Sequence, residues 1–368
     1  MRKLSFSDIR LNRPLPWDVF DDCGTLLLRK GYVIETDTQV RGLVARGLYI
    51  VAESAAPVAP APEPEVKFDP FWLWDDIHSK LVRVLRDVET EDYVFDKVTG
   101  IALLVNVLTD KDPDAALGAI LLKDCLRYAY THALHVAVMS AIISKKLGWS
   151  DDDRRDLVCA ALSMNIAMVA LQTQLLQQRT PLTPEQREAI DRHSTEGREL
   201  LLRKGVRNQR WLKTVELHHQ RLEVPNEAVT RPDGVAMSQL VRILDIFCAK
   251  ISPRAYRQAM LPPVAAREIF VAERDYKNPF LGVLIKEVGI YMPGTFIKLE
   301  NGEIALVVRR GPNVDTPRAV ALSRSDGTPY MDTIRRDTTK PEYAVKGAIP
   351  KEKVLHRVNL ARFWGYVH

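Results

Sequence analysis

The chain has 368 residues, of which 46% are hydrophobic and 27% are charged, a composition typical of globular proteins. Fifty-two Lys and Arg residues against 47 Asp and Glu residues give a net charge of +5, too weak a field over this length to indicate a nucleic-acid partner. No uncharged stretch approaches the roughly 20 residues of a membrane span, and residues 1–10 lack an apolar signal-peptide core. We therefore expect a cytoplasmic protein with two or three folded units.

Cysteine usage argues against two kinds of cross-linked site. The four cysteines are widely spaced and form no C-x-x-C pair; they are Cys23, Cys125, Cys159 and Cys248. The sequence therefore indicates neither a disulfide framework nor a zinc knuckle. We interpret each cysteine as a small buried apolar residue.

The first part of the chain predicts a small β-rich module, residues 1–51. Two β-type runs, Trp17–Phe20 and Thr25–Arg29, flank the turn sequence Asp21–Gly24, which indicates a hairpin. Residues 52–68 are dominated by Ala and Pro, with too little apolar bulk to fold and too much proline to form a helix. We interpret them as a stiff linker.

Residues 69–291 predict an all-helical domain, because apolar residues recur there at spacings of three and four. Ser150 before three aspartates has the character of a helix N-cap. Thr183 before Pro184 predicts another start, with proline at the first helical position.

Residues 292–368 predict a β-rich C-terminal extension. The runs Thr295–Leu299 and Ile304–Val308 flank Asn301 and Gly302, a strong hairpin signal. The predicted fold class is therefore mainly α, a helical bundle with a small β-rich module on each side in the sequence.

Histidines gather in the predicted helical domain and are followed by an aspartate: His132, His135, His193, His218, His219 and Asp245. Side chains from different helices of a bundle can converge on an interior site, and imidazole with carboxylate is a usual ligand set for Fe, Mn or Zn. Spacing alone leaves open that each histidine is an ordinary core or surface residue. Because His132 and His135 are three residues apart on one helix, we expect one to point toward a site and the other to face solvent.

Four segments in this order resemble the HD-GYP family, a branch of the HD superfamily of metal-dependent phosphohydrolases: RYAYTHALHVAVMSAIISKKLGWS, PLTPEQREAIDRHSTEGRELL, VELHHQ and RILDIFCAKISPRAYRQAM. The resemblance runs from about Leu121 to Tyr291 and implies the helical fold of cyclic di-GMP phosphodiesterases. It implies substrate-phosphate contacts at Arg254 and Arg257. It also implies metal ligands at His132, His193, His218, His219 and Asp245.

Two departures from the family pattern concern the chemistry. Where the family has HDIGK this chain has MNIAM, from Met164 to Met168, and no Gly-Tyr-Pro follows the paired histidines. A two-metal phosphodiesterase needs a bridging anion to hold two dications about 3.5 to 4 Å apart. Asn165 brings no charge, and the thioether of Met164 is a poor ligand for hard or borderline ions. We therefore expect the catalytic residues to be lost at Met164, Asn165 and Met168.

Two functions remain open. The first, which we favour, is a catalytically inactive module of cyclic di-GMP-related signalling that binds a signalling protein or cyclic di-GMP and needs no cofactor. The second is an active metal-dependent phosphohydrolase, a cyclic di-GMP phosphodiesterase with one Fe, Mn or Zn ion at an altered mononuclear site. Kinship with HDOD modules, metal-poor HD relatives used for regulation, predicts much the same biochemistry as the first. We expect both β-rich modules to pack on the bundle or on the second protomer of a homodimer.

Overall fold

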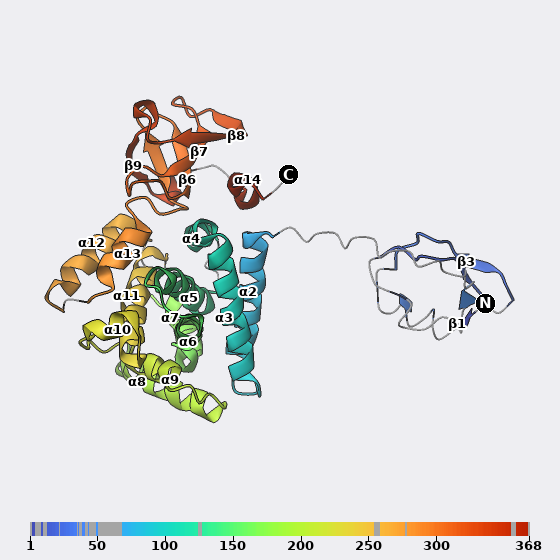
Figure 1. Cartoon of the computed structure of the whole chain (residues 1–368), viewed down its shortest axis with the longest axis horizontal. Helices are drawn as coiled ribbons and strands as arrows, with labels where there is room; N and C mark the ends of the chain where they lie inside the picture. The colour runs from blue at the N-terminus through green and yellow to red at the C-terminus, as the bar shows by residue number, and fades with distance from the viewer. Residues whose placement is uncertain are drawn as a thin grey trace. The chain divides into compact units, whose positions relative to one another are not determined.

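The chain folds into two compact units, residues 1–67 and 68–368. The computed structural model describes residues 68–123, 127–253, 258–276, 278–354 and 358–366 of the larger unit. In the smaller unit it describes residues 2–3, 9, 13–21, 23–34, 36, 39–40, 43 and 49–50, so residues 52–67 of the predicted linker lie outside the described residues. Most of the described chain is helical, with strands near each end of the sequence (Figure 1), which confirms the predicted fold class.

The smaller unit contains a four-stranded antiparallel sheet in the order β1-β4-β2-β3. Its strands are β1 Arg2–Lys3, β2 Val19–Phe20, β3 Leu26–Leu28 and β4 Tyr49–Ile50. The carboxylate of Asp21 accepts hydrogen bonds from the N–H groups of Cys23 at 3.0 Å and Thr25 at 2.7 Å, which closes the turn between β2 and β3. The predicted hairpin is confirmed. Because it lies in this turn, Cys23 is exposed, so its interpretation as a buried residue was wrong.

The larger unit begins with the helical domain. Its helices are α2 Pro70–Arg86, α3 Val94–Lys111, α4 Pro113–Leu122, α5 Tyr128–Lys146, α6 Asp151–Ser163, η2 Ile166–Met168, α7 Val169–Gln177, α8 Pro184–Arg203, α9 Gln209–Leu217, α10 Asn226–Thr230, α11 Gly234–Ile251, α12 Pro262–Glu273, η3 Arg274–Tyr276 and α13 Leu281–Val288. Helix α5 packs against α3, α6 and α11 and is buried over nearly its whole length. Cys159 and Cys248 are buried in this domain, as predicted, and Cys125 lies outside the described residues.

Two helix starts follow from the side chains that cap them. The Ser150 hydroxyl accepts the N–H of Asp153 at 3.2 Å at the start of α6, and Thr183 forms a capping box with Gln186 at the start of α8. Both predicted starts are confirmed. Within the described residues, the stretch Asp151–Gln177 is the one helical segment long and apolar enough to cross a membrane. Of its most apolar 18 residues, 61% are buried inside the fold, as in the core helices of a globular domain.

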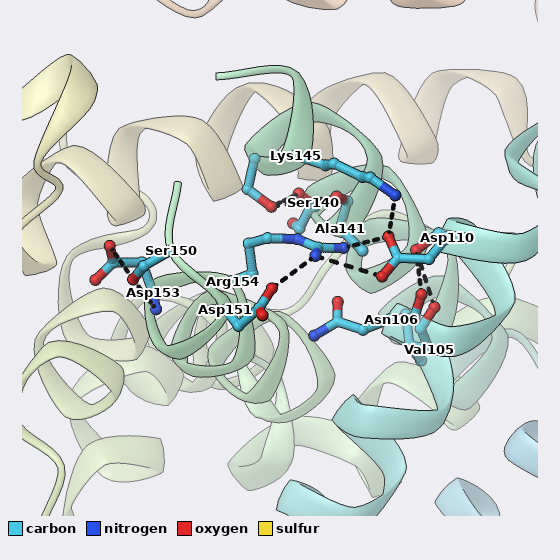
Figure 2. Close-up of polar contacts among 12 residues, drawn as sticks. Val105, Asn106, Asp110, Ser140, Ala141, Lys145, Ser150, Asp151, Asp153 and Arg154 are labelled. Carbon is cyan, nitrogen blue, oxygen red and sulfur yellow. Dashed lines mark hydrogen bonds and ion pairs between the residues drawn. The ribbon is translucent and has the colours of Figure 1, made fainter. Parts of the chain in front are cut away.

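A buried guanidinium ties α6 to α3, and Lys145 of α5 joins the same network (Figure 2). Arg154 of α6, which is 5% exposed, donates to Asp110 of α3 at 2.7 Å and to Asp151 at 3.1 Å. Lys145 donates to the same Asp110 carboxylate at 2.7 Å. Burial acts to raise the pKa of Asp110, but the hydrogen bonds from the two cations hold that pKa below its usual value. One carboxylate therefore fixes the relative position of three core helices.

The C-terminal part of the larger unit is a five-stranded antiparallel sheet in the order β8-β7-β6-β5-β9. Its strands are β5 Phe296–Leu299, β6 Ile304–Arg309, β7 Arg318–Ser323, β8 Pro329–Asp337 and β9 Val345–Ile349. The predicted hairpin joins β5 to β6, and Gly302 takes the left-handed conformation there, with φ 88°. The Asn301 side chain accepts the N–H of Glu303 at 3.1 Å.

The sheet packs directly on the helical domain. Phe296, Leu306 and Val308 belong to the same apolar core as the helices. Short helix α14, Leu360–Trp364, follows the sheet and lies near α2 and α4 in Figure 1. Its Trp364 stacks edge-on against Phe71 of α2, with ring centroids 5.4 Å apart. The tail strands thus pack on the bundle, one of the two arrangements that we expected.

Candidate metal centre

Three imidazoles meet between α8 and the end of α9. His193 lies in the middle of α8, and His218 and His219 directly follow α9. One ring nitrogen of each lies within 4.8 Å of one ring nitrogen of the others. His193 and His218 are buried, whereas His219 is exposed. The histidine cluster, as we name these three residues, is therefore accessible from solvent at His219.

Backbone carbonyls fix the tautomers of the two buried rings. His193 Nδ1 lies 2.5 Å from the carbonyl oxygen of Ile190, and His218 Nδ1 lies 2.7 Å from that of Val215. Because a carbonyl oxygen only accepts hydrogen bonds, each Nδ1 carries the proton, and the lone pair of the neutral ring is on Nε2. The two Nε2 atoms lie 3.4 Å apart.

This arrangement fits a shared cation. Two nitrogens that each bind a tetrahedral zinc ion at about 2.1 Å are roughly 3.4 Å apart, and a histidine ligand usually donates its other N–H to a carbonyl or carboxylate. Burial lowers the pKa of His218 to about 3 and also lowers the pKa of His193. Both rings are therefore neutral at pH 7, which is the form that binds a metal. The donors fit one divalent ion at His193, His218 and His219.

The other two predicted ligands form a hydrogen-bonded pair. Nε2 of His132, on α5, lies 2.6 Å from Oδ1 of Asp245, on α11. Burial acts to raise the pKa of Asp245, but the hydrogen bond from His132 and the electrostatic attraction to that residue hold that pKa below its usual range. While His132 donates Nε2–H to this carboxylate, the same nitrogen does not bind an ion. Tyr128 stacks on His132, with ring centroids 5.2 Å apart. The sequence analysis missed this residue, although its position four residues before His132 on one helix indicates that the two side chains can meet.

The turn from Met164 to Met168 lies against the helix that carries His193. Met164 directly follows α6 and is fully buried, Asn165 is 6% exposed, and η2 packs on α8. The carbonyl oxygen of Met164 lies 3.9 Å from the position that a Cβ would take on Gly197, four residues after His193. The turn from Met164 to Met168 therefore brings a thioether and an amide to this region, and it contains no carboxylate or imidazole.

A cavity of about 520 Å³ opens beside this turn and is lined by α5, α7 and the start of α8. Its lining is mostly apolar and includes Tyr128 and Met168. Gln172 lines it too, and its side-chain oxygen is buried without a hydrogen-bond partner among the described residues. Arg179 is the one cation among the lining residues and is exposed. The cavity offers space for an apolar or aromatic group and one positive charge.

Two further predictions concern the pair Arg254 and Arg257, and His135. Arg254 and Arg257 lie outside the described residues. His135 is 1% exposed and packs near Trp74, so the expectation that His132 or His135 faces solvent was wrong. Both are buried because α5 runs through the middle of the domain. Burial lowers the pKa of His135 to about 3, and neither of its ring nitrogens has a hydrogen-bond partner in the described part of the chain.

Known proteins resemble this chain over the region that contains these residues. The family model described as an HD domain matches residues 119–276. The cyclic di-GMP phosphodiesterase PA4108 of Pseudomonas aeruginosa is 24% identical over an alignment of 215 residues that covers 56% of this chain. The chain spans about half of that relative's length, 51%. Among solved structures, Bd1817, described as a HDG"Y"P protein from Bdellovibrio bacteriovorus, matches with a TM-score of 0.48 at 14% identity, covering 77% of this chain and 97% of that one.

Proposed function

Since residues 119–276 form an HD domain related to those of the HD-GYP proteins, we propose that this chain is a catalytically degenerate relative that serves cyclic di-GMP-related signalling by binding and not by hydrolysis. In this proposal it acts in the cytoplasm on a signalling protein or on cyclic di-GMP itself, as a monomer or a homodimer.

The observation that carries the proposal is that the turn from Met164 to Met168 packs on the helix of His193 and contains no anionic side chain. Two unit charges 4 Å apart repel by about 4 kcal/mol near a protein surface, and two dications repel about four times as strongly. An anion between the two ions is needed to offset this repulsion. Asn165 has no charge to supply, and Asp245 is already hydrogen-bonded to His132. We therefore infer that a second ion does not bind next to the first.

The facing Nε2 atoms of His193 and His218 favour one bound ion over the metal-free site that we expected from the sequence. A divalent ion at these residues and His219 would supply Lewis-acid polarisation of a phosphoryl oxygen. The chain's own residues would hold the ligand: the cavity beside Met168 takes an apolar or aromatic group, and Arg179 meets an anionic one. Met168 stands where the family has its phosphate-binding lysine, so one contact to the phosphate is lost.

The test is a hydrolysis assay of the purified chain with cyclic di-GMP and Mn²⁺ or Fe²⁺. The proposal predicts that the dinucleotide stays intact. Hydrolysis that disappears on His193→Ala would establish instead the second function, an active phosphohydrolase with a mononuclear site. The matched control is His78→Gln, which removes an imidazole that is hydrogen-bonded to Thr131 outside the cluster. We expect His193→Ala to lose bound metal and His78→Gln to retain it.

A further inference from the structure

An apolar groove of about 490 Å³ runs between α12 and α13 and shares no residue with the histidine cluster. Small residues line it, among them Ala266, Gly282 and Gly289. A Cβ placed on Gly282 would meet no atom within 4 Å, so open space lies directly above the backbone there. A side chain from another molecule can therefore approach the backbone of α13 closely.

Large apolar side chains border the groove and are open to solvent. Phe270 of α12 is 51% exposed, and Ile290 and Val314 are 41% and 52% exposed. Val264 and Val271 of the same helix are also exposed, at 47% and 66%, but they line a separate cavity. Single exposed apolar residues are ordinary, but a contiguous group around a groove marks a site of interaction.

The charged residues that line the groove are both cations, Arg267 on α12 and Lys286 on α13. Neither has an ion-pair partner within the residues that the structure describes. Two neighbouring acidic residues are engaged elsewhere, because Glu268 pairs with Lys250 at 2.6 Å and Glu287 pairs with Arg310 at 2.6 Å. The groove therefore presents uncompensated positive charge from both of its helices.

We propose that this groove binds an amphipathic helix of another protein, with apolar residues that enter the groove and acidic residues that meet Arg267 and Lys286. Amphipathic helices bind in apolar grooves in this way, and their charged residues set the partner choice. Two cations beside a largely apolar lining suit such a helix better than a nucleic acid, which needs many phosphate contacts. The proposal is independent of the function of the histidine cluster.

Fluorescence anisotropy tests the proposal on the full chain. The probe is a synthetic amphipathic helix of roughly 18 residues, about five turns, with leucine along one face and glutamate on each side of it. The comparison peptide carries lysine in place of each glutamate. We expect the glutamate peptide to bind about tenfold more tightly than the lysine peptide. Lys286→Glu should reverse or remove this preference.

Gly282→Leu should weaken binding of the glutamate peptide at least tenfold, and the open space at this helical position allows the variant to fold. Phe270→Ser should also weaken it, whereas the control Leu103→Ser should not, since Leu103 on α3 is equally exposed, at 51%. Equal binding of the two peptides, or binding unchanged by Gly282→Leu, would overturn the proposal. Two other results would also overturn it. If the chain self-associates and Gly282→Leu abolishes the self-association, the groove binds a second copy. If the chain binds phosphatidylserine vesicles and Gly282→Leu abolishes that binding, the groove binds a membrane.

Discussion

Asp112 joins three parts of the larger unit, so its substitution tests how firmly the C-terminal sheet is fixed to the helical domain. The residue is 3% exposed and forms the N-cap of α4, where its side chain accepts the N–H of Ala115 at 2.9 Å. The same carboxylate forms an ion pair with Arg309 of β6. It also accepts the hydroxyl of Tyr366, which follows α14, at 2.5 Å.

The cost of Asp112→Ala can be estimated from these contacts. Loss of the N-cap costs about 1 kcal/mol. Loss of the ion pair costs about 2 kcal/mol, less than for a fully buried pair, because the Arg309 side chain is 33% exposed. The unpaired hydroxyl of Tyr366 adds about 1 kcal/mol. We therefore expect a loss of about 4 kcal/mol in the free energy of unfolding of the larger unit. Asp112→Asn keeps an oxygen for the cap and should lose about half as much.

Urea unfolding followed by circular dichroism and by tryptophan fluorescence measures this loss, and both probes are needed to show that the sheet and the helices unfold together. The matched control is Asp332→Ala, which removes an exposed carboxylate and should change the stability by less than about 0.5 kcal/mol. A loss below about 1 kcal/mol for Asp112→Ala would mean that the ion pair and the hydroxyl contact contribute nothing to the stability of the larger unit.

Three further outcomes are expected. Gly118→Ala should lower the midpoint of urea unfolding, because the new Cβ would lie 2.5 Å from the ring of buried Trp364 and displace that ring. An unchanged midpoint would show that the Trp364 ring does not pack against Gly118. The hydrogen-bonded ion pair with Arg336 holds the pKa of Glu303 below its usual 4.5, so the stability that this pair contributes above pH 4.5 is lost as the pH falls through the pKa of Glu303 in the folded state. Glu303→Gln should therefore make the loss of stability with falling pH less steep, and an identical pH profile of the two proteins would contradict this. In calorimetric titration, any binding of cyclic di-GMP should weaken by about tenfold or more when Arg254 and Arg257 are both changed to alanine, with metal content unchanged; equal affinity would remove both arginines from the ligand site.

The local features of the fold were predictable because they depend on residues that are close in sequence. The Ser150 hydroxyl and the Thr183 capping box each satisfy N–H groups at most three residues away. The hairpin at Asn301 and Gly302 follows from a backbone conformation that glycine adopts without strain. Such interactions are the same in a short peptide and in the folded chain.

The candidate site was predictable only in part. The family resemblance identified the segments that carry the histidine cluster. It did not predict that the unprotonated Nε2 atoms of His193 and His218 face each other, because that arrangement depends on how α8 and α9 pack. The His132 pairing with Asp245 joins residues 113 positions apart, and the ion pair of Arg309 with Asp112 joins residues 197 positions apart. No local pattern selects such partners, because many distant residues could meet the same chemical need. Tyr128 was missed for a simpler reason, since a tyrosine at the start of an apolar helix is usually a core residue.

The turn from Met164 to Met168 is expected to prevent a second ion from binding beside the histidine cluster. Elemental analysis of Fe, Mn and Zn in the purified chain and in the double variant Met164→His, Asn165→Asp measures whether it does. We predict at most one ion per chain in the natural sequence, and a second ion in the variant, which restores the imidazole and the carboxylate. Two ions per chain in the natural sequence would show that this turn does not exclude a second ion.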